Sequence, residues 1–322
     1  QRVLVLSIPD WGVTPFGRGS GRDVAVIAAE LDAYNAVNHE ETARRGVAWV
    51  DIAPVSRARG GELVADDGLH PSAALYAEWA ALALPVAERL GVTLCMELLK
   101  ELGLNVAHTQ IGQFEDQKVL IVERFDRVWS RHGHLIRLPH EDLLQASGLP
   151  SHAKYESDGG PGIHTIMQVL SGSSNALADR QAFFKTLLVF YLLAAPDGHA
   201  KNFSLAIEPG GYFRLAPLYD VLSAWPWVGT KQNQCPIQRV KMAMALHTSN
   251  TRYKMQEVLL RHWLAVGKTY IGQQATESLI GDLHQLVEPA IQNVSARLPA
   301  HFPEHIKDAI FQGLRSNLQR LK

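Results

Sequence analysis

The feature that most constrains the fold of this 322-residue sequence is a strongly apolar run, FFKTLLVFYLLAA, at residues 183–195. Its most apolar part, residues 187–195, is too short to cross a bilayer, because a membrane-spanning helix needs about 20 apolar residues. We therefore predict a helix that is buried inside a folded domain. Pro-Asp-Gly follows directly and predicts a turn at the end of that helix.

The segment after this run, PDGHAKNFS at residues 196–204, is dense in polar side chains. On the simplest interpretation it is a polar turn between a buried helix and a hairpin, because Asp and Asn often bond their own backbone. Protein kinases, however, use an Asp that accepts the substrate hydroxyl proton, followed five residues later by an Asn that binds magnesium. Asp197 and Asn202 have this spacing. The spacing favours the kinase interpretation over a turn without chemistry.

A second candidate metal ligand follows a predicted hairpin. FSLAI at 203–207, Pro-Gly-Gly at 209–211 and YFRLA at 212–216 have the pattern of two strands joined by a turn. Asp220 then stands where kinases place their second magnesium-binding Asp. Magnesium needs few protein ligands when phosphate oxygens and water supply the rest, so Asn202 and Asp220 would suffice.

Four blocks in this order resemble the HipA family of bacterial toxin kinases. They are VLIVERFDR at 119–127, RLPHEDLLQASGLPSHAKYESDGGPGI at 137–163, PDGHAKNFS, and LAPLYD at 215–220. The resemblance runs from about residue 93 to the C-terminus. It implies a serine/threonine kinase that transfers the γ-phosphoryl group of Mg-ATP to a protein serine. It also implies a HipB-like antitoxin as partner, with DNA reached only through that antitoxin.

The resemblance also implies roles for individual residues. Asp197 would be the general base, and Asn202 and Asp220 would be the magnesium (Mg2+) ligands.

Four further residues would surround the nucleotide. His199 and Lys201 would be neighbours of the phosphates. Glu123 and Phe125, in VERFDR, would form the hinge between the kinase lobes, where the backbone meets the adenine. KYESDGGPGI, at 154–163, belongs to the resemblance but suggests no chemistry of its own beyond a fixed loop before a helix.

Residues 1–91 show a different pattern, in which strands and helices alternate. We predict strands at 3–8 and 47–52 and helices at 22–46 and 72–90. Short continuous strands between amphipathic helices are typical of a parallel sheet with covered faces. The predicted fold is thus an α/β segment, followed by a mainly α kinase-like C-lobe with a short β hairpin.

The composition changes where the resemblance begins. Residues 1–91 contain no lysine and have eight Arg against twelve acids, a net charge of −4, whereas residues 92–322 contain eleven lysines and carry +3. We predict a junction at Gly91–Thr93 between domains 1–91 and 92–322. The overall net charge of −1 argues against a protein that binds nucleic acid through a basic surface.

DDGLHPS, at residues 66–72, places Asp67 three residues before His70. A catalytic His needs a carboxylate on its far nitrogen to fix its tautomer, and this spacing can supply one. Otherwise the segment is an Asp-Gly turn before a Pro that opens a helix. SIPDWGVTPFG, VDIAPVS and DGLHPSAALYAEWA resemble the C-terminal half of SGNH (GDSL-like) hydrolases, which implies that Asp67 and His70 are two members of a catalytic triad.

The nucleophile of such a triad has no candidate. The family places its Ser in a GDS block near the start of the domain, and Ser7 and Ser20 lack that context. Without the nucleophile and the oxyanion donors, a serine hydrolase loses nearly all its rate advantage. We therefore predict an orphaned Asp67–His70 pair in a partial SGNH-like segment, and treat a remnant esterase as an alternative function.

The kinase half has a second gap. Between the junction and the hinge only Lys100 and Lys118 are available, and neither fits the strand Lys that grips ATP in kinases. We therefore expect weak ATP binding, and a catalytically dead module that binds the antitoxin is the other alternative. Cys95 and Cys235 lack the spacing of a zinc or redox site and fit a reducing compartment. A cytoplasmic location without membrane contact is the corresponding prediction.

Overall fold

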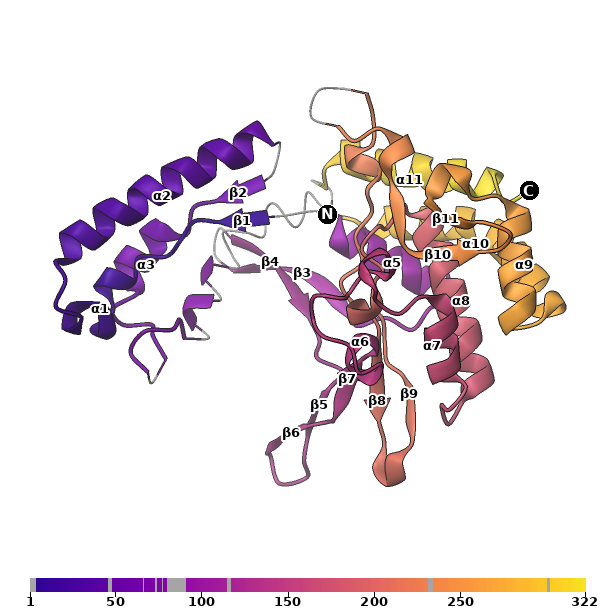
Figure 1. The fold of residues 1–322 in the computed structure, drawn as a ribbon, viewed down its shortest axis with the longest axis horizontal. Coiled ribbons are helices and arrows are strands. Elements are labelled where there is room, and N and C mark those ends of the chain that lie inside the picture. Colours follow the sequence, from indigo (N-terminus) through magenta and orange to yellow (C-terminus); the bar gives the residue numbers. More distant parts are fainter. Residues whose placement is uncertain are drawn as a thin grey trace. The chain divides into compact units, whose positions relative to one another are not determined.

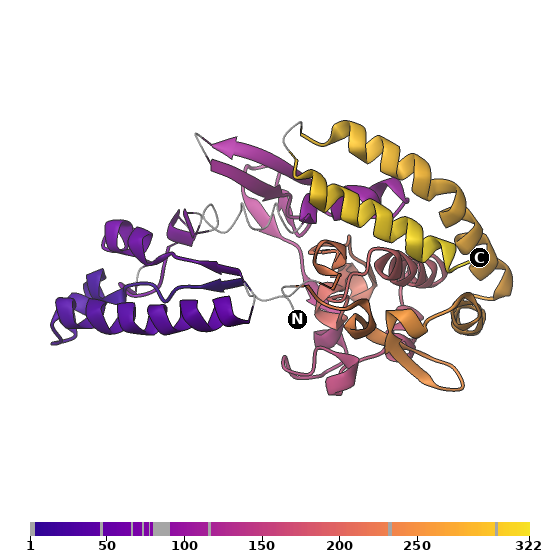
Figure 2. The same ribbon diagram turned by 90° about the horizontal axis from the view of Figure 1, so that it is seen from above.

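The computed structural model describes residues 4–45, 48–65, 67–72, 74–76, 78–79, 91–114, 117–230, 234–299 and 302–322. Figures 1 and 2 show the ribbon in two views. Contacts between residues divide the chain into two compact units. The first comprises Gln1–Arg89 with Ile111–Leu120, and the second comprises Leu90–Gln110 with Ile121–Lys322. Within the described ranges, no helix combines the length and apolar character needed to cross a membrane.

The first unit contains two short parallel strands and several helices. Their bounds are β1 Leu4–Leu6, η1 Trp11–Val13, α1 Pro15–Gly19, α2 Val24–Arg44, β2 Ala48–Val50 and α3 Ala53–Arg59. The register pairs Val5 with Trp49. The side chain of Asp23 accepts a hydrogen bond from the N–H of Ala25 and so begins α2, close to the predicted start. The helix predicted at 72–90 lies largely outside the described residues.

The described core of this unit is small. Val50, Ile52, Leu75 and Trp79 form one buried apolar cluster. Two paired strands of three residues each do not identify an SGNH-like sheet, so that part of the predicted fold class stays a prediction. The observed fold of the chain is a mixture of helices and small sheets.

The second unit is built around α8, whose C-terminal part is buried on all sides, as the apolar run predicts. Its helices are α5 Val92–Glu101, α6 Leu143–Ala146, α7 Ile163–Leu170, α8 Ala176–Leu192, α9 Leu260–Tyr270, α10 Gln273–Arg297 and α11 Glu304–Gln319. α7, α9 and α11 all contact α8 (Figure 1). Apolar residues from these helices, among them Phe184, Tyr191 and Trp263, form one continuous core.

Several short sheets complete this unit, beyond the single hairpin of the predicted fold class. The strands are β3 Thr109–Phe114, β4 Gln117–Val122, β5 Arg127–Trp129, β6 Leu135–Arg137, β7 His140–Asp142, β8 Ser204–Ile207, β9 Phe213–Leu215, β10 Lys241–His247 and β11 Thr251–Lys254. The β8–β9 hairpin matches the prediction, but β7 joins it as a third antiparallel strand. The β5–β6 and β10–β11 pairs are also antiparallel.

These additional strands are difficult to see in the sequence because they are short and lack a clear alternation of apolar and polar residues. All three residues of β6 are exposed, for instance, whereas the five central residues of β10 are all buried. Strand pairing here is decided by the partner strand, not by a local pattern.

Candidate functional site

The site forms where α8 ends. The terminal carbonyl groups of a helix need partners outside the helix, and at α8 they come from residues just after Asp220. The Ser223 hydroxyl donates to the Leu193 carbonyl at 2.6 Å, and the Trp225 indole N–H donates to the Leu192 carbonyl at 2.9 Å. The chain that follows Asp220 is thereby fixed to the helix that precedes Asp197.

Gly198 allows the loop to lie directly on α8. A Cβ atom at this position would stand 2.4 Å from Cδ2 of Phe190, which is too close for any residue other than glycine without a shift. The Gly of PDGHAKNFS is therefore needed for close packing, in addition to any role in turning the chain.

Asp197, Asn202 and Asp220 line one pocket. The other residues that line it are Phe190, Ala195, Gly198, Val221 and Leu222. The Asn202 side-chain amide donates through Nδ2 to the Asp197 carbonyl at 2.7 Å, which leaves its Oδ1 oxygen as an acceptor. The structure thus brings together the three residues that the sequence predicts as base and metal ligands.

Asp220 has the backbone conformation that marks a constrained position. Its φ angle of 56° lies in the left-handed region, which residues with a side chain rarely adopt and which is common at functional sites. Desolvation by the surrounding protein atoms is the main cause that raises the pKa of Asp220, and the charge of the Asp197 carboxylate is the second cause. By its solvent-accessible surface, Asp220 is nevertheless an exposed residue. Two carboxylates that line one pocket create a place where a cation would be stabilised.

His199 lies against the predicted base. Its side chain is buried, Nε2 is 3.6 Å from Oδ1 of Asp197, and burial is the main cause that lowers the pKa of His199. Its Nδ1 atom is buried and has no hydrogen-bond partner in the part of the chain that the structure describes. Lys201 contributes its carbonyl, which accepts from the Tyr219 hydroxyl at 2.9 Å, and it does not line the pocket.

The two predicted hinge residues lie outside that pocket as well. Phe125 stacks on the ring of Tyr219, with centroids 6.0 Å apart, and Tyr219 directly precedes Asp220. The side chain of Glu123 is 76% exposed, and its backbone N–H donates to the carbonyl of His108 at 2.9 Å.

The segment 154–163, to which the sequence assigned no chemistry, contributes to the site. The Tyr155 hydroxyl donates a hydrogen bond to Oδ1 of Asp197, and its ring packs edge-on against His199 at 5.0 Å. Burial, and next the bond to Asp197, raise the pKa of Tyr155. The ammonium group of Lys154 lies 5.0 Å from the centre of the Tyr155 ring, and its charge lowers the pKa of Asp220. The only sequence signal for these residues is the block KYESDGGPGI itself.

Glu156 connects the same segment to β10. Its carboxylate accepts from the backbone N–H of Ala245 at 2.6 Å and from Nε2 of His247 at 2.5 Å. A Cβ atom on Gly162 would come within 2.3 Å of the Glu156 carboxylate, so a side chain there would require that carboxylate to shift. The Gly-Gly-Pro-Gly sequence of this segment therefore lets the loop close around the Glu156 carboxylate.

In the first unit, Asp67 and His70 are hydrogen-bonded at 2.6 Å between Oδ2 and Nδ1. Backbone N–H groups of Leu69 and His70 lower the pKa of Asp67 to about 2, and both side chains are exposed. The Ser7 hydroxyl is buried and accepts from two backbone N–H groups at the start of α3, and the Ser20 hydroxyl donates to a carbonyl in α1. Neither hydroxyl has a described contact with His70.

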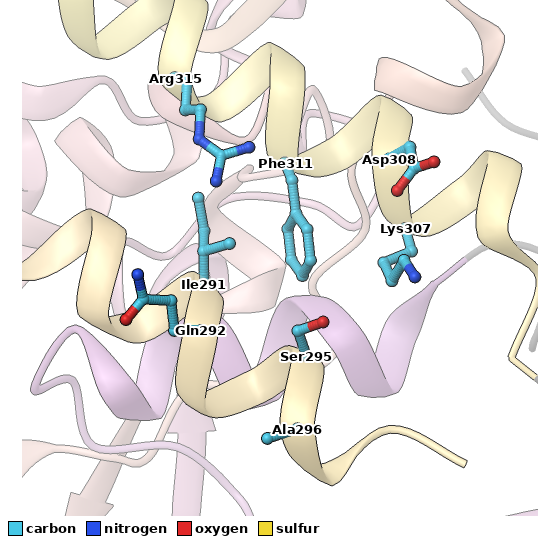
Figure 3. A pocket seen from close by; sticks show the side chains of 8 residues that line it. All are labelled: Ile291, Gln292, Ser295, Ala296, Lys307, Asp308, Phe311 and Arg315. Atoms are coloured by element: carbon cyan, nitrogen blue, oxygen red, sulfur yellow. The ribbon is translucent and has the colours of Figure 1, made fainter. Parts of the chain in front are cut away.

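A second, more open hollow lies between α10 and α11, which run side by side in Figure 2. Figure 3 shows its lining residues, which are Ile291, Gln292, Ser295, Ala296, Lys307, Asp308, Phe311 and Arg315. The guanidinium group of Arg315 is paired with Glu288. This hollow shares no residue with the Asp197 pocket.

The Asp197 pocket has the donor set of a hard cation. Among the described residues, no group of three or more His, Cys, Asp and Glu side chains could hold a metal by itself. A metal ion at the pocket would therefore take the Asp220 carboxylate and the Asn202 amide oxygen, with water and phosphate oxygens as its other ligands. Such oxygen ligands fit Mg2+ better than softer metals.

Residues 91–298 match the model of the HipA-like C-terminal domain. The chain belongs to that family. This HipA-like chain is 33% identical over 166 residues to a putative kinase, Y4mE, of Sinorhizobium fredii. That match covers 49% of the chain and 39% of the relative. The chain is also 31% identical over 140 residues to the serine/threonine-protein kinase toxin HipA of Shewanella oneidensis. That match covers 40% of the chain and 32% of the relative.

A solved structure has the same fold over most of the HipA-like chain. It is the HipA of Shewanella oneidensis, determined with HipB and its operator DNA, with a TM-score of 0.59 and 23% identity. The match covers 72% of this chain and 55% of that one. The chain thus spans about half of that structure and 32–39% of the length of the two relatives. The SGNH resemblance of residues 1–91 finds no support in these comparisons.

Proposed function

We propose that this chain is a HipA-type serine/threonine kinase domain that transfers the γ-phosphoryl group of Mg-ATP to a protein serine. The observation that carries the proposal is that Asp197, Asn202 and Asp220 line one pocket. Membership of the HipA-like family, whose named relatives are kinases, supports it. In the proposed domain organisation, residues 92–322 form the kinase domain and residues 1–91 form a partial SGNH-like segment.

In the proposed reaction Asp197 acts as the general base. Its carboxylate takes the proton from the serine hydroxyl while the serine oxygen forms a bond to the γ-phosphorus and the bond to the ADP oxygen breaks. A general base of this kind typically contributes about 10²- to 10⁴-fold to the rate. Asn202 and Asp220 would hold Mg2+, which neutralises phosphate charge when bound.

Charged and aromatic groups around the pocket would position the nucleotide. Lys154 is a candidate for a phosphate contact, because its charge already influences Asp220. His199, buried beside Asp197, would shape the floor of the site, and Lys201 would lie near the phosphates. Glu123 and Phe125 would form the adenine side, since Phe125 stacks on the residue that precedes Asp220.

The proposed partners follow the family. A HipB-like antitoxin would bind the chain, DNA would be reached only through that antitoxin, and a cytoplasmic protein serine would be the acceptor. The relative whose structure was solved with HipB and operator DNA supports this assignment.

The test measures nucleotide binding and phosphoryl transfer separately. Calorimetry with ATP and Mg2+ is expected to show that Asp220→Ala and Asn202→Ala each weaken magnesium-dependent binding at least about tenfold, since each removes a hard ligand. Asp197→Ala is expected to bind ATP like the wild type and to lose about 10²-fold or more of its transfer of labelled phosphate. Asp308→Ala, which removes an exposed carboxylate from the hollow between α10 and α11, is the matched control.

Two outcomes would contradict the proposal. Binding of ATP that does not respond to Asp220→Ala would place the nucleotide elsewhere. Normal binding without any transfer by the wild-type chain would favour the catalytically dead module that binds an antitoxin.

A further inference from the structure

We propose that Tyr155 is a positioning residue that holds the Asp197 carboxylate in the orientation needed to accept the acceptor's proton. This inference rests on the proposed kinase function and assigns a role to a residue outside the predicted catalytic set. Tyr155 lies 42 residues before Asp197 in the sequence, yet its hydroxyl donates directly to Oδ1 of that carboxylate.

The carboxylate needs such a partner because its side chain is 44% exposed and could otherwise rotate. The backbone of the same residue is already fixed, since Asn202 donates to the Asp197 carbonyl. Tyr155 adds a second point of attachment at the side chain. With Oδ1 held, Oδ2 is the oxygen left to accept the proton of a serine hydroxyl.

Tyr155 can hold another residue only if it is itself fixed, and three contacts achieve this. The ring packs edge-on against buried His199. Lys154 lies over the ring at 5.0 Å, within the range of a cation–π interaction. The next residue, Glu156, is bound to β10 through the Ala245 N–H and His247.

The chain of contacts therefore runs from β10 through Glu156 and Tyr155 to Asp197. Glu156 and Tyr155 are neighbours in the chain, and the links at the two ends are hydrogen bonds to the Glu156 and Asp197 carboxylates. Such charge-assisted bonds are about twice as strong as neutral ones. A raised pKa keeps the Tyr155 phenol protonated at neutral pH, as a donor must be. The conformation of the predicted base is thus set by a loop that precedes α7 and by the strand behind it.

The experiment compares Tyr155→Phe with the wild-type full-length chain. Removal of one hydroxyl group is expected to leave the Kd for Mg-ATP and the KM for ATP within about twofold while kcat falls about tenfold, as when an interaction made in the transition state is lost. Tyr212→Phe, at a side chain that is 63% exposed, is the matched control and is expected to leave all three values unchanged. Glu156→Gln is expected to lower kcat in the same way but by less.

A double-mutant cycle makes the hydrogen bond testable apart from turnover. In thermal unfolding, Tyr155→Phe and Asp197→Asn are expected to lower Tm by less together than the sum of their separate shifts, because the first removes the hydrogen bond that the second weakens. The kcat of the double variant is expected to equal that of Asp197→Asn alone.

Three results would overturn the inference. An additive thermal cycle would mean that Tyr155 does not hold Asp197 in solution. An unchanged kcat for Tyr155→Phe would mean that Tyr155 contributes only packing. An increased kcat would mean that the Tyr155 hydroxyl obstructs the binding of the acceptor serine. A wild-type chain without any turnover would refute the proposed kinase function instead, while the thermal cycle would still decide whether Tyr155 holds the carboxylate.

Discussion

Asp126 is a buried carboxylate next to the proposed hinge. Its side chain is 2% exposed and accepts hydrogen bonds from the guanidinium groups of Arg124 and Arg127, with His140 at 3.5 Å. Arg124 is the main cause that holds the pKa of Asp126 well below its usual range. Because Phe125 lies between these two residues and stacks on Tyr219, this ion-pair network fixes the segment that contacts the site.

Asp126→Asn is expected to destabilise the chain by about 1–3 kcal/mol at pH 7, since it weakens charge-assisted bonds to a buried group. The folded-state pKa is lowered, so the contribution of Asp126 is fully present above the unfolded value of about 3.9 and is lost as the pH falls towards the folded value. Urea unfolding from pH 7 to pH 3 measures this. The difference from the wild type should be constant above about pH 5 and shrink below about pH 4.

Asp308→Asn provides the comparison, because its carboxylate is exposed on α11 and lines the open hollow. It is expected to change stability by less than about 0.5 kcal/mol at either pH. A difference for Asp126→Asn that persists unchanged at pH 3 would mean that packing, not charge, accounts for its effect.

At the scale of elements, the end of α8 and the β8–β9 hairpin together form the site. α8 supplies Phe190 as the surface on which the loop lies, and residues after β9 bond its terminal carbonyls. The hairpin between these attachments returns the chain, so that Asp220 meets Asp197. The site therefore depends on the close contact at Gly198.

Gly198→Ala is expected to destabilise the chain by about 1–3 kcal/mol, because the added methyl group overlaps the Phe190 ring and inserts volume into a packed contact. It should also weaken magnesium-dependent ATP binding, since Asp197 and Asn202 would move with the loop. Combining it with Phe190→Leu makes room for the methyl group. The double variant is then expected to be more stable than the sum of the two single effects predicts, as measured by urea unfolding.

Strict additivity of Gly198→Ala and Phe190→Leu would mean that the two residues do not meet in solution. Gly281→Ala is a useful reference, since a Cβ atom there would have no neighbour within 4 Å.

At the scale of the whole molecule, the two units differ in the size of their described cores. The apolar cluster of the first unit consists of four buried residues, whereas the second unit has a continuous core drawn from most of its helices. Stability rises with the apolar area that a unit buries, so we expect the first unit to open more readily than the second.

Limited proteolysis tests this difference. Brief digestion is expected to remove residues 1–91 and to leave a resistant fragment that begins near residue 92, identified by mass spectrometry. A calorimetric scan should likewise show more than one transition, because the units would not unfold together. Survival of a fragment from residues 1–91 with loss of the second unit would contradict both expectations.

The sequence by itself predicted the parts of this protein whose signals are local. The apolar run before PDG indicated the buried end of α8, and the turn at 209–211 indicated the β8–β9 hairpin. The five-residue spacing of Asp197 and Asn202 pointed to one site, because residues on a single loop stay close in any fold.

Only the tertiary structure decided the contacts between segments that lie far apart in the chain. Tyr155 meets Asp197 across 42 residues, and Glu156 meets Ala245 across 89, and no periodicity in the sequence encodes either contact. The added strand β7 likewise pairs with β8, a strand that a distant segment supplies. The physical reason is that side-chain hydrogen bonds and strand pairing gain their energy from the partner's position, which is set when the core around α8 packs.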